Sequence, residues 1–224
     1  NKKIPTLVGI FVFIGFLYYL SCKMNEQHQN IKNFLTTLIQ DNLENFELVD
    51  GGQQRTVGDL IENKVIEIVK AIQNPLITEV KLSTGKKSMD DVSVVSDGVT
   101  YMLDPKSHNV DSEFSMPNMS SISKIKKLHH TPNKELMYVL IDYKVDGNIV
   151  LIEKIDVLFI WELDMSILGI GALGKGQLQI KNLNKELVIN EDGKDVWYDG
   201  LKKKVVEYLK KQEVKIKKQQ KEWE

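Results

Sequence analysis

A glycine-rich stretch holds the most familiar chemical pattern in the chain. Residues 169–174 satisfy G-x-G-x-x-G, as in dinucleotide-binding loops, and with Lys175 they nearly satisfy a phosphate-binding loop. Both patterns need a helix directly afterwards, because the amino-terminal amides of that helix hold the phosphate. Residues 177–180 alternate like a strand instead, and Gly176 stands where a Ser or Thr would reach Mg²⁺. The stretch is therefore interpreted as a bend or bulge between strands, and no nucleotide cofactor is predicted.

Other candidate catalytic groups are scattered along the chain. Asp142, Glu153, Asp156 and Glu162 lie on two long predicted strands, where paired carboxylates could perform acid–base chemistry. Lysines alternate with them, so charge pairs between neighbouring strands are the simpler explanation. The single cysteine, Cys22, lies in an apolar segment, the four histidines lack a partner at ligand spacing, and no G-x-S-x-G is present. The sequence thus predicts no enzyme, no cofactor and no metal.

The segment at residues 4–22 contains nineteen residues without a charge. As a helix it would extend about 28 Å, close to the hydrocarbon core of a bilayer at about 30 Å. Lysines flank it and tyrosines lie near its end, as at membrane interfaces. A cleaved signal peptide or a lipoprotein signal is the alternative, but a single-pass anchor is preferred. Its membrane-contacting residues are predicted to be Ile4, Leu7, Val8, Ile10, Phe11, Phe13, Ile14, Phe16, Leu17, Tyr18, Tyr19 and Leu20.

Charge and composition limit the expected partners. The net charge is −1, which gives no general attraction for nucleic acid or anionic membranes. Residues 201–224 carry nine lysines against four glutamates, so the basic character is confined to this tail. Arg55 is the only arginine and alanine is scarce, a bias typical of AT-rich genomes such as those of large DNA viruses and protists. The positive-inside rule weakly favours a cytosolic amino terminus.

Two amphipathic helices are expected after the anchor. Apolar residues recur at spacings of three and four through residues 25–47 and again through 56–72. A glycine pair at 51–52 ends the first helix, and Pro75 ends the second, so the two helices should form an antiparallel pair. The buried face of the second helix is predicted to contain Leu60, Ile61, Val65, Ile68, Val69 and Ile72.

After the helices the apolar period changes to two, which predicts strands. Strands are expected at residues 77–82, 92–95, 99–103, 136–145, 149–163, 177–183 and 187–190. Asp97-Gly98 and Asp146-Gly147 are expected to be tight hairpin turns. The strand at 149–163 is apolar on both faces and should be central in a mainly antiparallel sheet. Residues 104–132 are predicted to form a long loop that contacts a neighbouring protein.

A basic helix is expected at residues 201–224. Its first half has an apolar stripe and should dock, whereas its second half should project into solvent. The functional alternative is contact with anionic lipid or an acidic partner through Lys202, Lys203, Lys204, Lys210, Lys211, Lys215, Lys217 and Lys218. Nucleic acid is disfavoured as a partner, because no aromatic platform accompanies these lysines. In the glycine-rich stretch, the candidates for lipid or partner contact are Ile167, Leu168, Ile170 and Leu173.

Together these patterns predict an α+β fold with a single transmembrane helix at residues 1–24, a domain at 25–200 and the basic helix at 201–224. Within the domain, a helical pair at 25–74 packs on a sheet at 76–190. The predicted function is that of a non-catalytic, membrane-anchored structural or tethering subunit of a larger assembly. A minor capsid protein that links a virion inner membrane to its capsid, or a subunit of a protist membrane complex, is the expected setting. A membrane-anchored lipid- or small-ligand-binding module is the alternative. The expected partners are the lipid bilayer and other protein subunits.

Overall fold

The computed structural model describes residues 7–48, 54–83, 85, 88–112, 118–171, 176–181 and 187–223, with the backbone alone for 7–24 and 54–56. Its helices are α1 (Leu7–Asn42), α2 (Gln54–Lys70), α3 (Ile122–His129), α4 (Lys194–Lys221) and the 3-10 helix η1 (Ile160–Glu162). Its strands are β1 (Phe46–Glu47), β2 (Glu79–Leu82), β3 (Val92–Ser96), β4 (Val99–Asn109), β5 (Asn118–Ser121), β6 (Lys134–Asp146), β7 (Ile149–Phe159), β8 (Leu168–Gly171) and β9 (Gln177–Ile180).

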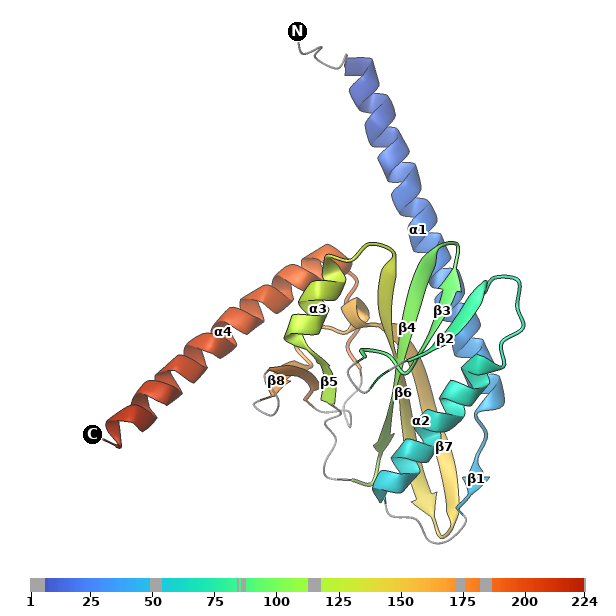
Figure 1. Ribbon diagram of the computed structural model, residues 1–224, viewed down its shortest axis with the longest axis vertical. Helices are drawn as coiled ribbons and strands as arrows, with labels where there is room; N and C mark the ends of the chain where they lie inside the picture. The colour runs from blue at the N-terminus through green and yellow to red at the C-terminus, as the bar shows by residue number, and fades with distance from the viewer. Residues whose placement is uncertain are drawn as a thin grey trace.

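Two sheets with helices on both sides form the body of the molecule. The large sheet has the strand order β1-β7-β6-β4-β3-β2, and the small sheet has the order β5-β9-β8. Helices α1 and α2 cover one face of the large sheet, whereas α3, the small sheet and the start of α4 pack on its other face (Figure 1). The predicted α+β class is therefore confirmed.

The two long amino-terminal helices bury one stripe each. In α1, Ile31, Leu35 and Ile39 are at most 1% exposed, and their spacing of four places them on one face towards the sheet. In α2, the fully buried residues include Ile61, whereas Leu60, predicted to be buried, is 41% exposed. The helical period was thus predicted correctly, but the width of the buried stripe on α2 was overestimated.

Tight turns set the register of the two hairpins in the large sheet. Asp97 and Gly98 have φ values of +46° and +77°, the positive values that a type I′ turn requires at both central residues. Gly147, with a φ of +62°, and Asn148 form the two-residue turn from β6 to β7, in which only the first central residue has a positive φ. The predicted turn at Asp97-Gly98 is confirmed, whereas the second turn lies one residue later than predicted, because Asp146 still pairs with Ile149. All the large-sheet pairings are antiparallel except that of β4 with β6.

The predicted loop at residues 104–132 contains three structured elements. Strand β4 continues to Asn109 and pairs in parallel with β6, and β5 and α3 then follow in the crossover between these two strands. The polar run at 104–109 lacks the β-branched and aromatic residues that usually indicate a strand. Its strand conformation depends on pairing with β6, which a local reading of the sequence does not reveal.

A second core lies on the face of the large sheet opposite α1 and α2. Ile125 and Leu128 of α3 pack there with the small sheet and with Trp197 and Leu201 at the start of α4. Helix α4 begins at Lys194, before the start predicted at residue 201. Beyond its docked first turns, α4 extends away from the body (Figure 1).

The predicted membrane anchor is not supported. Of its candidate residues, Ile4 lies outside the described residues, and those from Leu7 to Leu20 have only their helical backbone described, as part of α1. In the part of the chain that the structure describes, no helix has the length and apolar character needed to cross a bilayer. This finding contradicts the predicted single-pass membrane localisation, which is withdrawn. An uncharged run indicates apolar surface, and apolar surface alone does not specify that its neighbour is lipid.

Neighbouring residues of α2 provide a test of this packing. Replacing Ile61 by Ala should lower the free energy of unfolding by about 2–5 kcal/mol, because it leaves a cavity between α2 and the sheet. Replacing the exposed Leu60 by Ala should change that free energy by less than about 1 kcal/mol. Urea unfolding followed by circular dichroism measures both values, and equal losses for the two variants would contradict this orientation of α2.

Candidate active site

The carboxylates selected from the sequence on β6, β7 and η1 each have a separate partner. Asp142 lies 3.0 Å from Nδ1 of His108, and Glu153 forms an ion pair of 2.5 Å with Lys144. Glu162 accepts hydrogen bonds from Lys32 at 2.5 Å and from the backbone N–H of Phe159 at 2.8 Å. Each carboxylate thus has its own partner, and among the described residues only the pair of Glu153 with Lys144 joins the two predicted strands.

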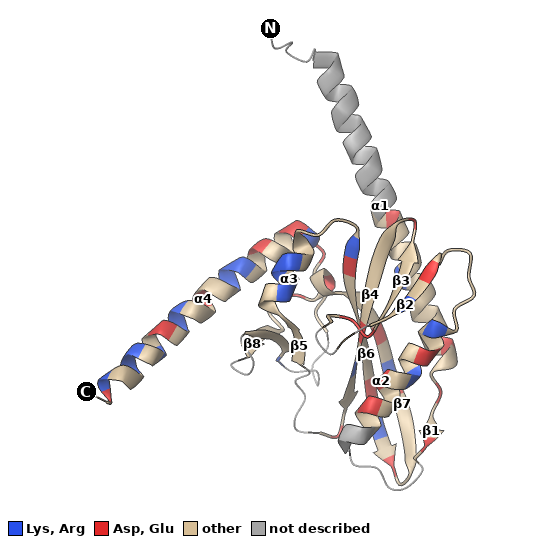
Figure 2. Ribbon diagram, in the orientation of Figure 1, with Lys and Arg blue, Asp and Glu red and all other residues tan. Residues whose placement is uncertain are grey.

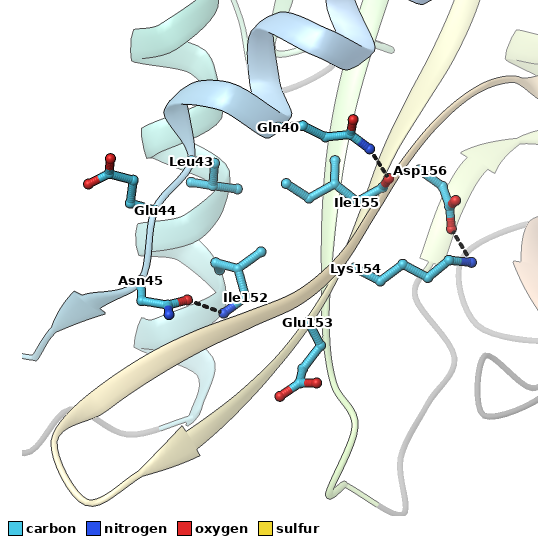
Figure 3. Close-up of a pocket in the computed structure, with 9 residues that line it drawn as sticks. All are labelled: Gln40, Leu43, Glu44, Asn45, Ile152, Glu153, Lys154, Ile155 and Asp156. Atoms are coloured by element: carbon cyan, nitrogen blue, oxygen red, sulfur yellow. Dashed lines mark hydrogen bonds and ion pairs between the residues drawn. The ribbon is translucent and has the colours of Figure 1, made fainter.

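A surface cavity of about 660 Å³ lies beside β7 and the end of α1. In Figure 3, Lys154 and Asp156 point towards one another, at 2.7 Å, whereas Glu44 and Glu153 extend in different directions. The Asn45 side chain accepts the backbone N–H of Ile152 at 2.8 Å. The polar groups here satisfy the end of the helix and the strand, and the arrangement offers no set of convergent groups.

The remaining candidates from the sequence lie apart from one another. Leu168 is fully buried in the second core, Ile167 and Ile170 are partly buried, and Leu173 lies outside the described residues. The tail lysines are distributed along α4 (Figure 2). Lys202 pairs with Asp199, Lys204 donates to the Met165 carbonyl and Lys217 pairs with Glu213, whereas Lys203, Lys210, Lys211, Lys215 and Lys218 are exposed.

A different group of charged residues meets where β3 and β4 separate. Val92 pairs with Leu103, and the backbone N–H of Asp91 donates to the Leu103 carbonyl at 3.0 Å. Asp91 directly precedes β3, and its bond goes to the residue that Val92 already pairs with, so the regular register ends at Val92. Asp104 directly follows Leu103 on β4, and Asp91 and Asp104 line the same cavity, where the negative charge of Asp91 acts on Asp104. The end of the strand pairing thus brings two carboxylates to one cavity.

Lys106 joins these carboxylates because it lies two residues beyond Asp104 on the same strand and so faces the same side. Its Nζ lies 2.5 Å from Oδ1 of Asp104 and 3.1 Å from the Pro105 carbonyl oxygen. The side chains of Lys106 and Asp104 are only 20% and 11% exposed. The ammonium is consequently held over the strand and has little freedom to move into solvent.

Glu62 reaches the same place from α2, around the edge of the sheet. Strand β3 no longer covers β4 beyond Leu103, and Oε1 of Glu62 accepts the free backbone N–H of Ser107 at 3.1 Å and its hydroxyl at 3.2 Å. One consequence is structural, because the carboxylate satisfies an edge that would otherwise lack a partner. The other is electrostatic, because a third acidic group approaches Lys106.

The pKa values show that these groups share one electrostatic environment. Burial, together with the negative charges of Asp91 and Glu62, raises the pKa of Asp104 to about 6 although Lys106 opposes the shift. Burial likewise raises the pKa of Glu62. Burial lowers the pKa of Lys106, but the three carboxylates outweigh it, so that this pKa is raised overall. A second cation would therefore relieve the repulsion among the carboxylates.

A cavity of about 410 Å³ opens over this cluster, and Glu62, Asp91, Asp104 and Lys106 all line it. No three acidic, histidine or cysteine side chains in the described ranges converge closely enough to enclose a metal ion by themselves. Mg²⁺ does not require three protein ligands, because it is usually held by one or two carboxylates, with water and substrate phosphates as its other ligands. The paired carboxylates of Asp91 and Asp104 fit that requirement in chemical type and in number.

The sequence contained a signal for this site that local patterns did not reveal. Asp91 and Asp104 are equidistant from the turn at Asp97-Gly98, so the predicted hairpin brings them to the same end of its two strands. Lys106 then follows at the strand period of two. The predicted strand ended at residue 103 and assigned Asp104 to a loop, so the constellation was missed.

Comparisons with known proteins address the fold. A scan of protein-family models and a search of curated protein sequences found no match. A search of solved structures found the NlaIV restriction endonuclease, with a TM-score of 0.50 and 16% sequence identity. The match covers 73% of this chain and 73% of that chain. At this identity the likeness concerns the fold alone.

These findings contradict the predicted membrane tether. The chain is similar in fold to an enzyme, and the described helices include no membrane span. The non-catalytic subunit, the membrane-anchored ligand-binding alternative and the virion and capsid setting are withdrawn, and the neighbour gives no support to the expectation that the chain is not an enzyme. The error arose because an apolar run is visible in the sequence, whereas a site assembled by strand pairing is not.

A buried tyrosine behind the site provides a second test. Tyr138 pairs with Asp104 in the parallel register, and its hydroxyl oxygen accepts the backbone N–H of Ser120 in β5 at 3.0 Å. Replacing Tyr138 by Phe should lower the free energy of unfolding by about 1–3 kcal/mol, because a buried N–H loses its acceptor. Replacing Tyr208, on the projecting part of α4, by Phe should change it by less than about 0.5 kcal/mol. Equal values in urea unfolding would show that the Tyr138 hydrogen bond does not hold β5 in place.

Proposed function

We propose that this chain is a nuclease that hydrolyses phosphodiester bonds of nucleic acid with the aid of a divalent cation. The observation that carries the proposal is that Asp91, Asp104 and Lys106 line one cavity, in which the Lys106 ammonium contacts the Asp104 carboxylate. Glu62 lines the same cavity from the opposite side of β4. The likeness in fold to a restriction endonuclease supports the assignment to this class of enzyme.

Asp91 and Asp104 are the residues that would hold the cation. Their oxygens are the hard ligands that Mg²⁺ prefers, and the open cavity leaves room for water and a substrate phosphate. When bound, such a cation polarises a phosphoryl oxygen and lowers the pKa of water.

Lys106 supplies a fixed positive charge beside the reacting phosphate. In hydrolysis the oxygen of a water molecule attacks phosphorus, and the bond from phosphorus to the leaving sugar oxygen breaks. Negative charge is stabilised in the transition state by positive groups that are already in place, since such groups need no reorganisation. The contacts of Lys106 with Asp104 and with the Pro105 carbonyl hold the ammonium in that position.

Glu62 acts as a positioning residue in this scheme. Its hydrogen bonds to the backbone and hydroxyl of Ser107 fix the free edge of β4 directly after Lys106. They also hold α2 against that edge. The carboxylate therefore limits the motion of the strand that carries both Asp104 and Lys106.

The proposal is tested by nuclease assays on plasmid and short linear DNA and RNA, with Mg²⁺ or Mn²⁺. Asp104→Asn and Lys106→Ala should each reduce the cleavage rate by at least about 100-fold, because each removes a group that stabilises the transition state. The matched controls are Asp156→Asn and Lys154→Ala, which change the same two residue types at the same spacing on β7. These controls should retain the wild-type rate.

Two results would overturn the proposal. One is the absence of cation-dependent cleavage of every DNA and RNA substrate by the folded wild-type chain. The other is cleavage that Asp104→Asn and the control Asp156→Asn reduce to the same extent. Circular dichroism of each variant separates a lost site from a lost fold.

A further inference from the structure

The cavity over Asp104 continues into a second one of about 570 Å³. Four residues, Ser88, Met89, Asp90 and Lys124, line both cavities. Shared walls mean that the two cavities are parts of one groove, which runs from the carboxylates across the uncovered face of β3 and β4. The groove is bounded on its other side by α3, whose residues Lys124 and Lys127 line it.

Four lysines from β2, α3 and β6 surround the second part of this groove, which we call the lysine groove: Lys81, Lys124, Lys127 and Lys134. Thr100 also lines it, and Lys134 pairs with Thr100 in the parallel register, so both residues lie on the face that carries Asp104. Figure 2 shows positive charge on α3, the helix that carries Lys124 and Lys127.

One carboxylate, Asp90, lines the lysine groove together with the four lysines, so the charge of the lining is positive overall. Lys81 pairs with Glu79 at 2.7 Å, but both side chains are 53% exposed, so the pair is weak. Lys124 donates to the Ser88 carbonyl at 2.8 Å. Lys127 and Lys134 are exposed and form no ion pair among the residues that the structure describes. A positive groove next to a cluster of carboxylates thus has charge available for an external anion.

The lining of the groove favours a duplex over a single strand. Proteins that bind single-stranded nucleic acid combine positive charge with aromatic side chains on which bases stack. The described residues that line the two cavities include no aromatic side chain. In a duplex the bases already stack on one another, and only the phosphates need a partner.

We propose that the lysine groove binds the phosphate backbone of double-stranded nucleic acid and so delivers a phosphodiester bond to Asp91, Asp104 and Lys106. This inference rests on the proposed nuclease function and names the substrate class of that site. The lysines are needed because the carboxylates at the end of the groove repel a polyanion. Each lysine–phosphate contact releases a counterion, so binding depends on salt concentration.

The test is binding of a fluorescent duplex DNA to the full chain in EDTA, where no cation supports cleavage, measured by anisotropy over a series of salt concentrations. The variant Lys127→Ala/Lys134→Ala should bind several-fold more weakly, and its plot of log K against log salt should be shallower by about two. The matched control is Lys64→Ala/Lys70→Ala on α2, which removes the same charge from the opposite face of the sheet. This control should keep the wild-type slope.

Equal weakening by the groove variant and the control would overturn the inference, as would tighter binding of the single strand than of the duplex. Cleavage assays then separate the two proposals. If Lys127→Ala/Lys134→Ala cleaves at the wild-type rate, the proposal that the lysine groove binds the duplex is contradicted, whereas the nuclease proposal is not. If the wild type binds duplex DNA but cleaves nothing, and the variant loses this binding, the groove is supported as a binding site. The nuclease proposal is then contradicted.

Discussion

The register of the β3–β4 hairpin is the constraint on which the site depends. The turn at Asp97-Gly98 needs positive φ at both residues, and that geometry fixes which residues of the two strands face each other. A slip of one residue would send Asp104 and Lys106 to the face covered by α2 and would separate them from Asp91. The turn therefore influences where Asp91 lies relative to Asp104 and Lys106, which contact one another within β4.

The rest of the molecule supports the hairpin from two sides. Apolar residues of α1 and α2 pack on one face of the large sheet, so the strands cannot shift without exposing that core. On the other face, the buried residues of α3, the small sheet and α4 form a second core beside the cleft. Because β3 ends before β4 does, Glu62 can reach the free edge at Ser107. The cavity over Asp104 therefore lies where the pairing of β3 with β4 stops, beside the second core.

Much of this fold could be predicted from the sequence, but the site could not be predicted by local patterns. Apolar periods identified α1, α2 and the β6–β7 hairpin, because these signals lie within short windows. Residues 104–109 were predicted to form a loop because their side chains are polar. Asp104 and Lys106 line the cavity, and the strand conformation of this segment depends on its pairing with β6. The uncharged run before residue 23 suggested a membrane partner that the described structure does not support. The polar residues at this end of β4 depart from the apolar pattern of the other strands, and such departures are expected at functional sites.

The most direct test of the central claim is calorimetric titration of the folded chain with Mn²⁺. A single cation site shared by Asp91 and Asp104 requires that Asp91→Asn and Asp104→Asn each weaken binding by at least about tenfold, whereas Asp156→Asn leaves it unchanged. Mn²⁺ binding that survives both substitutions, or no binding by the wild type, would contradict the claim that strand pairing builds a cation site here.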